Sequence, residues 1–108
     1  MELNEYQKKA LYTAMFKEEW AIIYPALKLA GEAGEVAEKI GKVLRDNDGK
    51  FNENKKYEIA REIGDVLWYI ATLSHNIGYS LEEIAVINIE KLADRKKRNK
   101  ITGSGDNR

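Results

Sequence analysis

Apolar residues recur along this chain at intervals of three and four positions, and no stretch alternates apolar with polar residues long enough to predict a strand. That period is typical of amphipathic helices, each of which buries one face. A capping-box spacing between Ser80 and Glu83 marks the start of the last helix. Four helices are predicted, over residues 4–17, 24–44, 55–76 and 80–98. The expected fold is all-α, with an architecture like a four-helix bundle.

Polar and glycine-containing segments separate these helices. Residues 45–54 form a turn rich in Asn, Asp and Gly, and Gly78 is a helix stop signal. The chain is expected to divide into one helical domain, residues 1–98, and a basic, glycine-rich C-terminal tail, residues 99–108.

Composition narrows the classes of function. The 108 residues suffice for one domain with a modest core. The absence of cysteine excludes disulfides, thiolate nucleophiles and cysteine-bound zinc. The first residues are charged and no long apolar run follows, so neither a signal peptide nor a membrane span is expected. A cytoplasmic protein without a membrane partner is predicted.

Charge is balanced overall but uneven along the chain. The 18 basic and 18 acidic side chains argue against a protein that coats nucleic acid, and no stable nucleic-acid partner is expected. Residues 91–108 nevertheless hold seven Lys or Arg against two Asp. An anionic ligand would find its charge partner there.

Two segments repeat one pattern and align without a gap at an offset of thirty. They read LAGEAGEVAEKIGKVL (29–44) and IAREIGDVLWYIATLS (59–74). Both carry a glycine inside the helix, Gly34 and Gly64, where glycine lowers helix stability. These glycines would let a backbone or a ligand approach closely.

Four carboxylates hold matching positions in the two segments: Glu32 and Glu35 in the first, Glu62 and Asp65 in the second. If the apolar faces pack as an antiparallel hairpin, the carboxylates converge at one rim. Converging carboxylates must take up protons or bind cations, and an all-oxygen site favours Mg²⁺, with Mn²⁺ as a substitute and Ca²⁺ as a non-productive occupant. The alternative is that they form the solvated edges of ordinary amphipathic helices.

This motif, E-x-x-E on one helix followed by E-x-x-D on a later one, resembles the signature of the MazG-like superfamily of all-α nucleotide pyrophosphohydrolases. The phrases LAGEAGEVAEKI and EIGDVLWYIATL and the final GSGDNR also resemble that family, and the resemblance spans nearly the whole chain. Lys28 and Asn99 depart from it, because short members often carry glycine there. The departures leave the local turns and the path of the tail open.

The resemblance implies Mg²⁺-dependent hydrolysis of a nucleoside triphosphate between its α and β phosphates, which gives a monophosphate and pyrophosphate. The implied role is house-cleaning of the nucleotide pool, in which canonical or damaged nucleotides are hydrolysed. The metal ligands would be Glu32, Glu35, Glu62 and Asp65. Glu35 or Glu38 would be the catalytic general base, although Glu38 also suits a plain surface position. The chain offers no Ser–His or Cys–His nucleophile, which favours direct attack by water.

Further residues are expected to contact the substrate: Gln7, Lys39, Tyr69, Asn88, Lys91 and Arg95. Gln7 and Tyr69 match positions that relatives use, Tyr69 for the sugar or base, and helical packing is the alternative for Tyr69. Lys39 would reach a phosphate or pair with Glu35. The last three recur at helical spacing, which suits either phosphate oxygens or a solvated basic face.

Two other functions stay open from the sequence: phosphoribosyl-ATP pyrophosphatase, which cleaves the same kind of bond, and a non-catalytic helical regulator that binds nucleotide or RNA. A homodimer or homotetramer is expected. The run from Trp20 to Tyr24 is too apolar for an exposed linker, and Trp68 lies on the far side of its helix from the Ile59–Ile70 face. Relatives in the superfamily are dimers or tetramers, which adds to that expectation.

Overall fold

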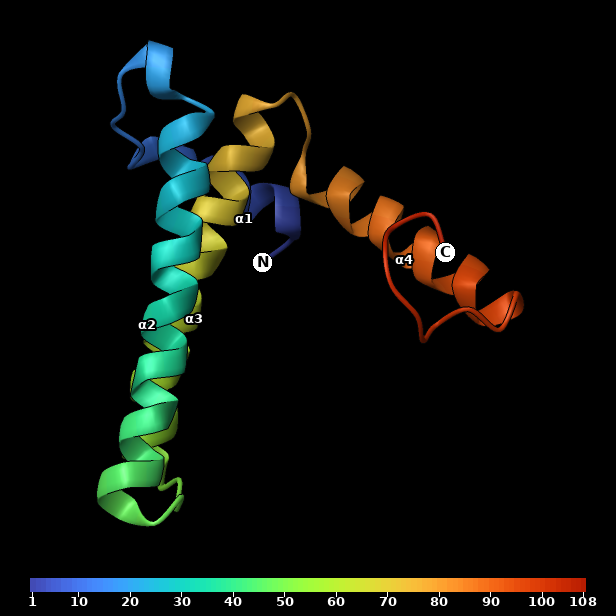
Figure 1. Cartoon of the computed structure of the whole chain (residues 1–108). Coiled ribbons are helices and arrows are strands. Elements are labelled where there is room, and N and C mark those ends of the chain that lie inside the picture. The colour runs from blue at the N-terminus through green and yellow to red at the C-terminus, as the bar shows by residue number, and fades with distance from the viewer.

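The computed structural model describes all 108 residues and contains helices only (Figure 1). Its elements in chain order are α1 (Leu3–Tyr12), the short 3₁₀ turn η1 (Glu18–Trp20), α2 (Ile23–Asn47), α3 (Glu53–Asn76) and α4 (Leu81–Lys97). The all-α prediction is confirmed. None of these helices has an apolar stretch long enough to cross a bilayer.

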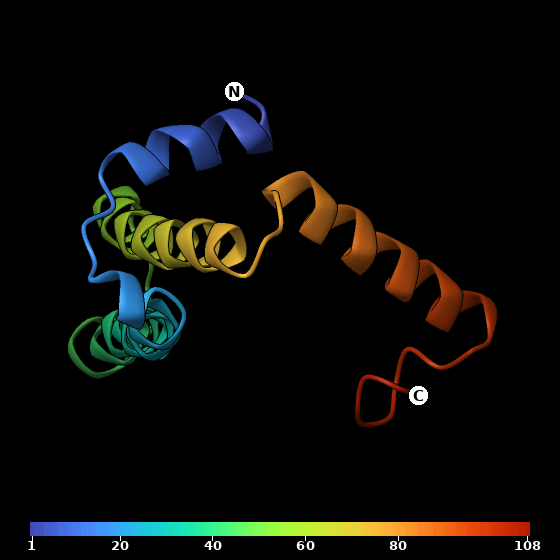
Figure 2. The same cartoon turned by 90° about the horizontal axis from the view of Figure 1, so that it is seen from above.

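Helices α2 and α3 form an antiparallel hairpin, as predicted, and lie side by side along most of their length (Figures 1 and 2). The chain reverses at Asp48 and Gly49, whose φ angles of 53° and 72° lie in the left-handed region that Asp and Gly tolerate. Asn52 caps α3, because its side-chain oxygen accepts a hydrogen bond of 2.8 Å from the Lys55 N–H. Successive turns of α2 therefore face those of α3 in reverse order.

Helix α1 is shorter than predicted, ending at Tyr12 instead of continuing to residue 17. The reason is a set of contacts with the hairpin. The Trp68 indole donates a hydrogen bond of 2.8 Å to the Thr13 hydroxyl. The ring centroid of Phe16 lies 5.8 Å from that of Tyr24 and 6.0 Å from that of Trp68. Trp68 thus packs against Thr13 and Phe16 of its own chain and is half-buried there, so it gives no separate argument for a partner subunit.

Helix α4 leads away from the hairpin. Its predicted capping box is confirmed: the Ser80 hydroxyl accepts from the Glu83 N–H at 3.1 Å, and the Glu83 carboxylate accepts from the Ser80 N–H at 3.0 Å. After Gly78, with φ 94°, the chain turns outward, and α4 contacts α1 and α3 but not α2 (Figure 2). Only α1, α2 and α3 therefore form the expected bundle-like packing.

Gln7 joins α1, α3 and α4. Its side-chain nitrogen donates to the carbonyl oxygens of Ala71, at 3.0 Å, and Tyr79, at 3.1 Å. Its side-chain oxygen accepts from the Leu81 N–H at 3.1 Å. Gln7 is buried, next to a small core made by Ala10 and its neighbours. The amide that was expected to contact substrate is thus fully engaged in holding the start of α4.

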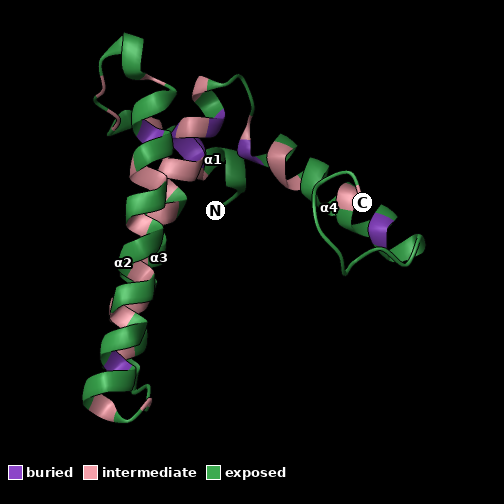
Figure 3. Ribbon diagram, in the orientation of Figure 1, coloured by how far each residue is buried: buried purple, intermediate pink, exposed green.

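The single chain buries very little of itself (Figure 3). The apolar faces of α2 and α3 were expected to pack against each other, but Ile40 on α2 and Ile63 on α3 are 37% and 52% exposed. Leu27 on α2 and Ile89 on α4 are 69% and 64% exposed. The chain therefore leaves large apolar side chains on three of its helices in contact with solvent.

The C-terminal tail folds back along α4. Asn99 has φ 60°, a left-handed conformation that Asn tolerates. The Arg95 guanidinium donates to the backbone oxygen of Asp106 at 2.8 Å and to its carboxylate at 3.2 Å, and the Lys91 ammonium lies 3.2 Å from the same carboxylate. Arg95 is buried as a result.

Candidate active site

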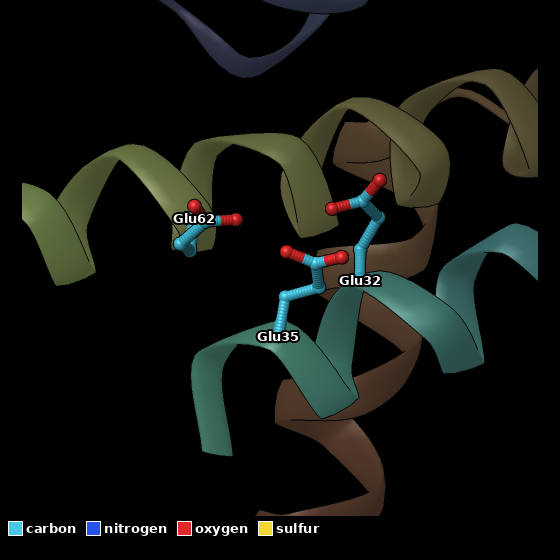
Figure 4. Close-up of side chains that lie close together, drawn as sticks. All are labelled: Glu32, Glu35 and Glu62. Atoms are coloured by element: carbon cyan, nitrogen blue, oxygen red, sulfur yellow. The ribbon is translucent and has the colours of Figure 1, made fainter. Parts of the chain in front are cut away.

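Three carboxylates meet midway along the hairpin. Glu32 and Glu35 project from neighbouring turns of α2, and Glu62 projects toward them from α3 (Figure 4). One oxygen from each of the three lies within 4.8 Å of the others. The i, i+3 spacing on α2 puts its two carboxylates on one side of that helix, and the antiparallel partner supplies the third.

Asp65 lies one turn beyond Glu62 and lines a hollow of about 310 Å³ together with Glu32. Burial raises the pKa of Glu32, and the negative charges of Asp65, Glu35 and Glu62 raise it further, while Lys28 opposes them. The four carboxylates, called the acidic cluster below, therefore repel one another in the absence of a cation.

The acidic cluster suits a hard divalent cation. All its donors are carboxylate oxygens, the ligands that Mg²⁺ prefers. Bonds of about 2 Å to Mg²⁺ place neighbouring ligand oxygens roughly 3–4 Å apart, and small side-chain rotations bring oxygens spaced within 4.8 Å to that separation. Glu32 and Glu62 are half-buried and Glu35 is exposed, which leaves one side of the cluster open to a ligand.

Basic residues surround the cluster. Lys39 lines a second hollow, of about 200 Å³, together with Arg61, Glu62 and Asp65. Lys39 was predicted to reach a phosphate, whereas Arg61 and Lys28 were not predicted as cations of the site. The overlooked signal was spacing: Lys28 precedes Glu32 by four residues and Arg61 precedes Asp65 by four, so each shares a helix face with a carboxylate.

Aromatic rings border the cluster on the other side. Trp68 and Tyr69 line the same hollow as Glu32 and Asp65, and their ring centroids lie 4.9 Å apart in a T-shaped arrangement. Burial raises the pKa of the Tyr69 hydroxyl. Tyr69 is half-buried, so it both packs in the fold and faces the hollow.

Several expected site residues lie elsewhere. Glu38 is outside the group of converging carboxylates: its side chain is 65% exposed and pairs with Lys42 at 3.3 Å. Asn88, Lys91 and Arg95 lie on α4, which diverges from the hairpin (Figure 1). In the single chain these three residues are remote from the acidic cluster.

The helical glycines make no close contact within the chain. A β-carbon added to Gly34 or Gly64 would meet no atom within 4 Å. The expectation that these glycines let two backbones of this chain approach closely is wrong, since the space beside each is open.

The fold and the cluster define a class of all-α proteins in which carboxylates from two antiparallel helices converge beside a hollow. Within that class, the chain belongs to the family of MazG nucleotide pyrophosphohydrolase domains, whose profile matches residues 25–99. The matched residues include all of α3 and α4 and nearly all of α2, and so the whole acidic cluster.

Two relatives are similar over most of their length. The Gene 37 protein of Mycobacterium phage L5 is 44% identical over 85 residues, covering 79% of this chain and 75% of the relative. The uncharacterized protein YvdC of Bacillus subtilis (strain 168) is 33% identical over 87 residues, covering 73% and 82%. No solved structure matches the chain. Neither name states an activity, so a function must be argued from the family and the site.

Proposed function

We propose that this protein is a Mg²⁺-dependent nucleoside triphosphate pyrophosphohydrolase that releases a monophosphate and pyrophosphate. The observation that carries the proposal is the acidic cluster, formed by two helices of a chain that belongs to the MazG family. Carboxylates at this spacing can hold a cation against phosphate oxygens, and a bound cation would relieve their mutual repulsion.

Glu32, Glu35, Glu62 and Asp65 would hold Mg²⁺ or Mn²⁺, which supplies charge neutralisation for the triphosphate and lowers the pKa of a water. Glu35 is the candidate general base, because it is the exposed member of the three converging carboxylates while Glu38 is paired with Lys42. Glu35 accepts the proton as the water oxygen bonds to the α phosphorus. The bond to the bridging oxygen breaks, and pyrophosphate leaves with the electron pair.

The neighbouring side chains position the substrate. Trp68 and Tyr69 offer ring surface to the nucleoside beside Glu32 and Asp65. Lys39 stands on the other side of the cluster, where its ammonium stabilises the charge that develops on the phosphates.

A second copy of the chain completes the site in this proposal, within a homodimer or homotetramer. Lys91 and Arg95 extend away from their own acidic cluster on α4, so they would serve the phosphates bound by another subunit (Figure 1). Both cations pair with Asp106 in the single chain, so a phosphate would have to replace that carboxylate to reach them.

The test is a panel of ribo- and deoxynucleoside triphosphates, with phosphoribosyl-ATP included, assayed for pyrophosphate release with and without Mg²⁺. Release that requires Mg²⁺ or Mn²⁺ is expected. Turnover confined to phosphoribosyl-ATP would instead identify the protein as a phosphoribosyl-ATP pyrophosphatase. No release from any member of the panel would refute the proposal.

A further inference from the structure

A basic groove lies next to the acidic cluster, toward the closed end of the hairpin. It is a hollow of about 420 Å³ between the C-terminal half of α2 and the first turns of α3. Three lysines line it: Lys39 and Lys42 from α2, and Lys55 from α3. We refer to it as the lysine groove.

The lysine groove is continuous with the site. Lys39 and Glu58 line both this groove and the hollow that contains Glu62 and Asp65. Glu62 and Lys55 are seven residues apart on α3, which is about two helical turns or ~10 Å. A chain of phosphates that begins at the acidic cluster can therefore continue along the same face of the hairpin into the groove.

The lysines of the groove are available to an anion. Lys39 forms no ion pair, and the Lys55 ammonium lies 3.8 Å from the Glu58 carboxylate. Lys42 pairs with Glu38, but both side chains are more than half exposed, and exposed pairs of this kind are weak. Asp46, the other carboxylate of the groove, is held by the Arg45 guanidinium through bonds of 2.7 and 2.8 Å.

We infer that the lysine groove binds the β and γ phosphates of the substrate, and so holds the pyrophosphate that leaves. This inference rests on the proposed function and assigns the bound substrate one orientation along the hairpin. The nucleoside lies at the aromatic end, beside Trp68 and Tyr69, and the last phosphate lies nearest Lys55. A groove that engages the γ phosphate makes the enzyme prefer triphosphates to diphosphates.

The experiment compares Lys42→Ala and Lys55→Ala with the control Lys56→Ala. Lys56 is adjacent to Lys55 on α3 and exposed, but it pairs with Glu53 and does not line the groove. Each groove variant should raise KM for the best triphosphate about three- to tenfold, while the control keeps the wild-type value. The preference in kcat/KM for triphosphate over diphosphate should fall, and Mg²⁺-pyrophosphate should inhibit more weakly. Lys42→Arg, which keeps the charge, should restore most of the loss.

The outcomes separate this inference from the proposed function. If the wild type releases pyrophosphate but the groove variants match Lys56→Ala in KM, preference and inhibition, the lysine groove has no role and the inference fails. If the wild type releases no pyrophosphate, the proposed function fails. Titration with inorganic tripolyphosphate then tests by itself whether the lysine groove binds an anion. Binding lost in both groove variants and kept in the control supports an anion site, whereas equal binding in all four proteins overturns it.

Discussion

Glu32 has a raised pKa because it is partly buried among other carboxylates, and a cation would remove that repulsion. Replacing Glu35 by Gln, or Asp65 by Asn, should abolish turnover while the fold is kept. The metal-free variants should be as stable as the wild type or more stable, because a neutral amide repels no carboxylate. Mg²⁺ should raise the Tm of the wild type and leave that of the variants unchanged.

The measurements are pyrophosphate release and thermal unfolding followed by circular dichroism. Glu5→Gln is the matched control, since Glu5 is an exposed carboxylate on α1 that pairs only with Lys9. It should keep both the activity and the Mg²⁺ effect. Near-wild-type turnover in both cluster variants would refute the assignment of these carboxylates as metal ligands.

Gln7 gives a second test, because its buried amide makes three hydrogen bonds to backbone groups of α3, α4 and the turn between them. Gln7→Ala should lower the free energy of unfolding by about 3 kcal/mol, since buried backbone groups would lose their partners. Denaturant unfolding at fixed protein concentration measures this, with the exposed neighbour Lys8→Ala as control. If the Gln7→Ala protein is as stable as the wild type but has a raised KM for the triphosphate, Gln7 contacts the substrate as the sequence predicted.

These two examples show which side chains could be assigned from the sequence. The carboxylates recur at a helical spacing that appears twice, so their common face follows from the geometry of a helix. Gln7 has no such pattern: its partners are backbone groups 64 to 74 residues away, and only the three-dimensional fold brings them together. Arg61 and Lys28 could have been found by the same spacing rule, applied to cations.

The helix boundaries also differ in whether the sequence alone predicts them. The start of α4 was predictable because a capping box is a local interaction between Ser80 and Glu83. The end of α1 was not, because Phe16 and Thr13 leave the helix to contact residues of α2 and α3 that are distant in sequence. The outward direction of α4 was not predictable either, since an apolar helix face indicates burial but not the molecule that covers it.

The tail and α4 are joined by a carboxylate whose titration can be followed. The hydrogen bond from Lys91, and then that from Arg95, lowers the pKa of Asp106 below its ordinary value of 3.8. A lowered folded pKa means that the contact stabilises the docked tail above about pH 3.8 and is lost as the pH falls through the lower folded value. The tail should therefore be ordered at pH 7 and become mobile in acid below pH 3.8.

Backbone ¹⁵N relaxation of residues 102–107 measures this release. Asp106→Asn should show a mobile tail already at pH 7, while Ser104→Ala, which changes a tail residue whose side chain forms no hydrogen bond, should behave like the wild type. A tail that is equally ordered in Asp106→Asn and in the wild type would show that other contacts hold it.

The whole chain is too open for its size. Its radius of gyration is 16.7 Å, whereas a compact chain of this length has about 13 Å. Its accessible surface is 8261 Å², whereas a folded monomer of this mass exposes roughly 6,100 Å². The excess, about 2,000 Å² per chain, matches what an obligate homodimer interface covers.

Light scattering at micromolar concentration should therefore find a particle of at least twice the 12.4 kDa chain mass. Ile89→Glu, on the exposed face of α4, should weaken assembly and lower activity together, because a charge cannot be buried there without a partner. Glu90→Gln, next to it on α4, is the control and should leave the mass unchanged. An active wild-type particle near 12.4 kDa would show that one subunit suffices.

The hairpin of α2 and α3 also determines the order of events when the chain folds. Its helices are neighbours in sequence, and such local structure forms within microseconds to milliseconds. Association of two chains is bimolecular and slows as the protein is diluted. Refolding should thus show an early phase in helix signal that is independent of concentration and a later phase whose rate rises with it. Between the two phases the apolar faces that the expected homodimer buries should stay in contact with solvent. Dilution ordinarily protects a refolding protein from aggregation, but for this protein it should prolong that interval.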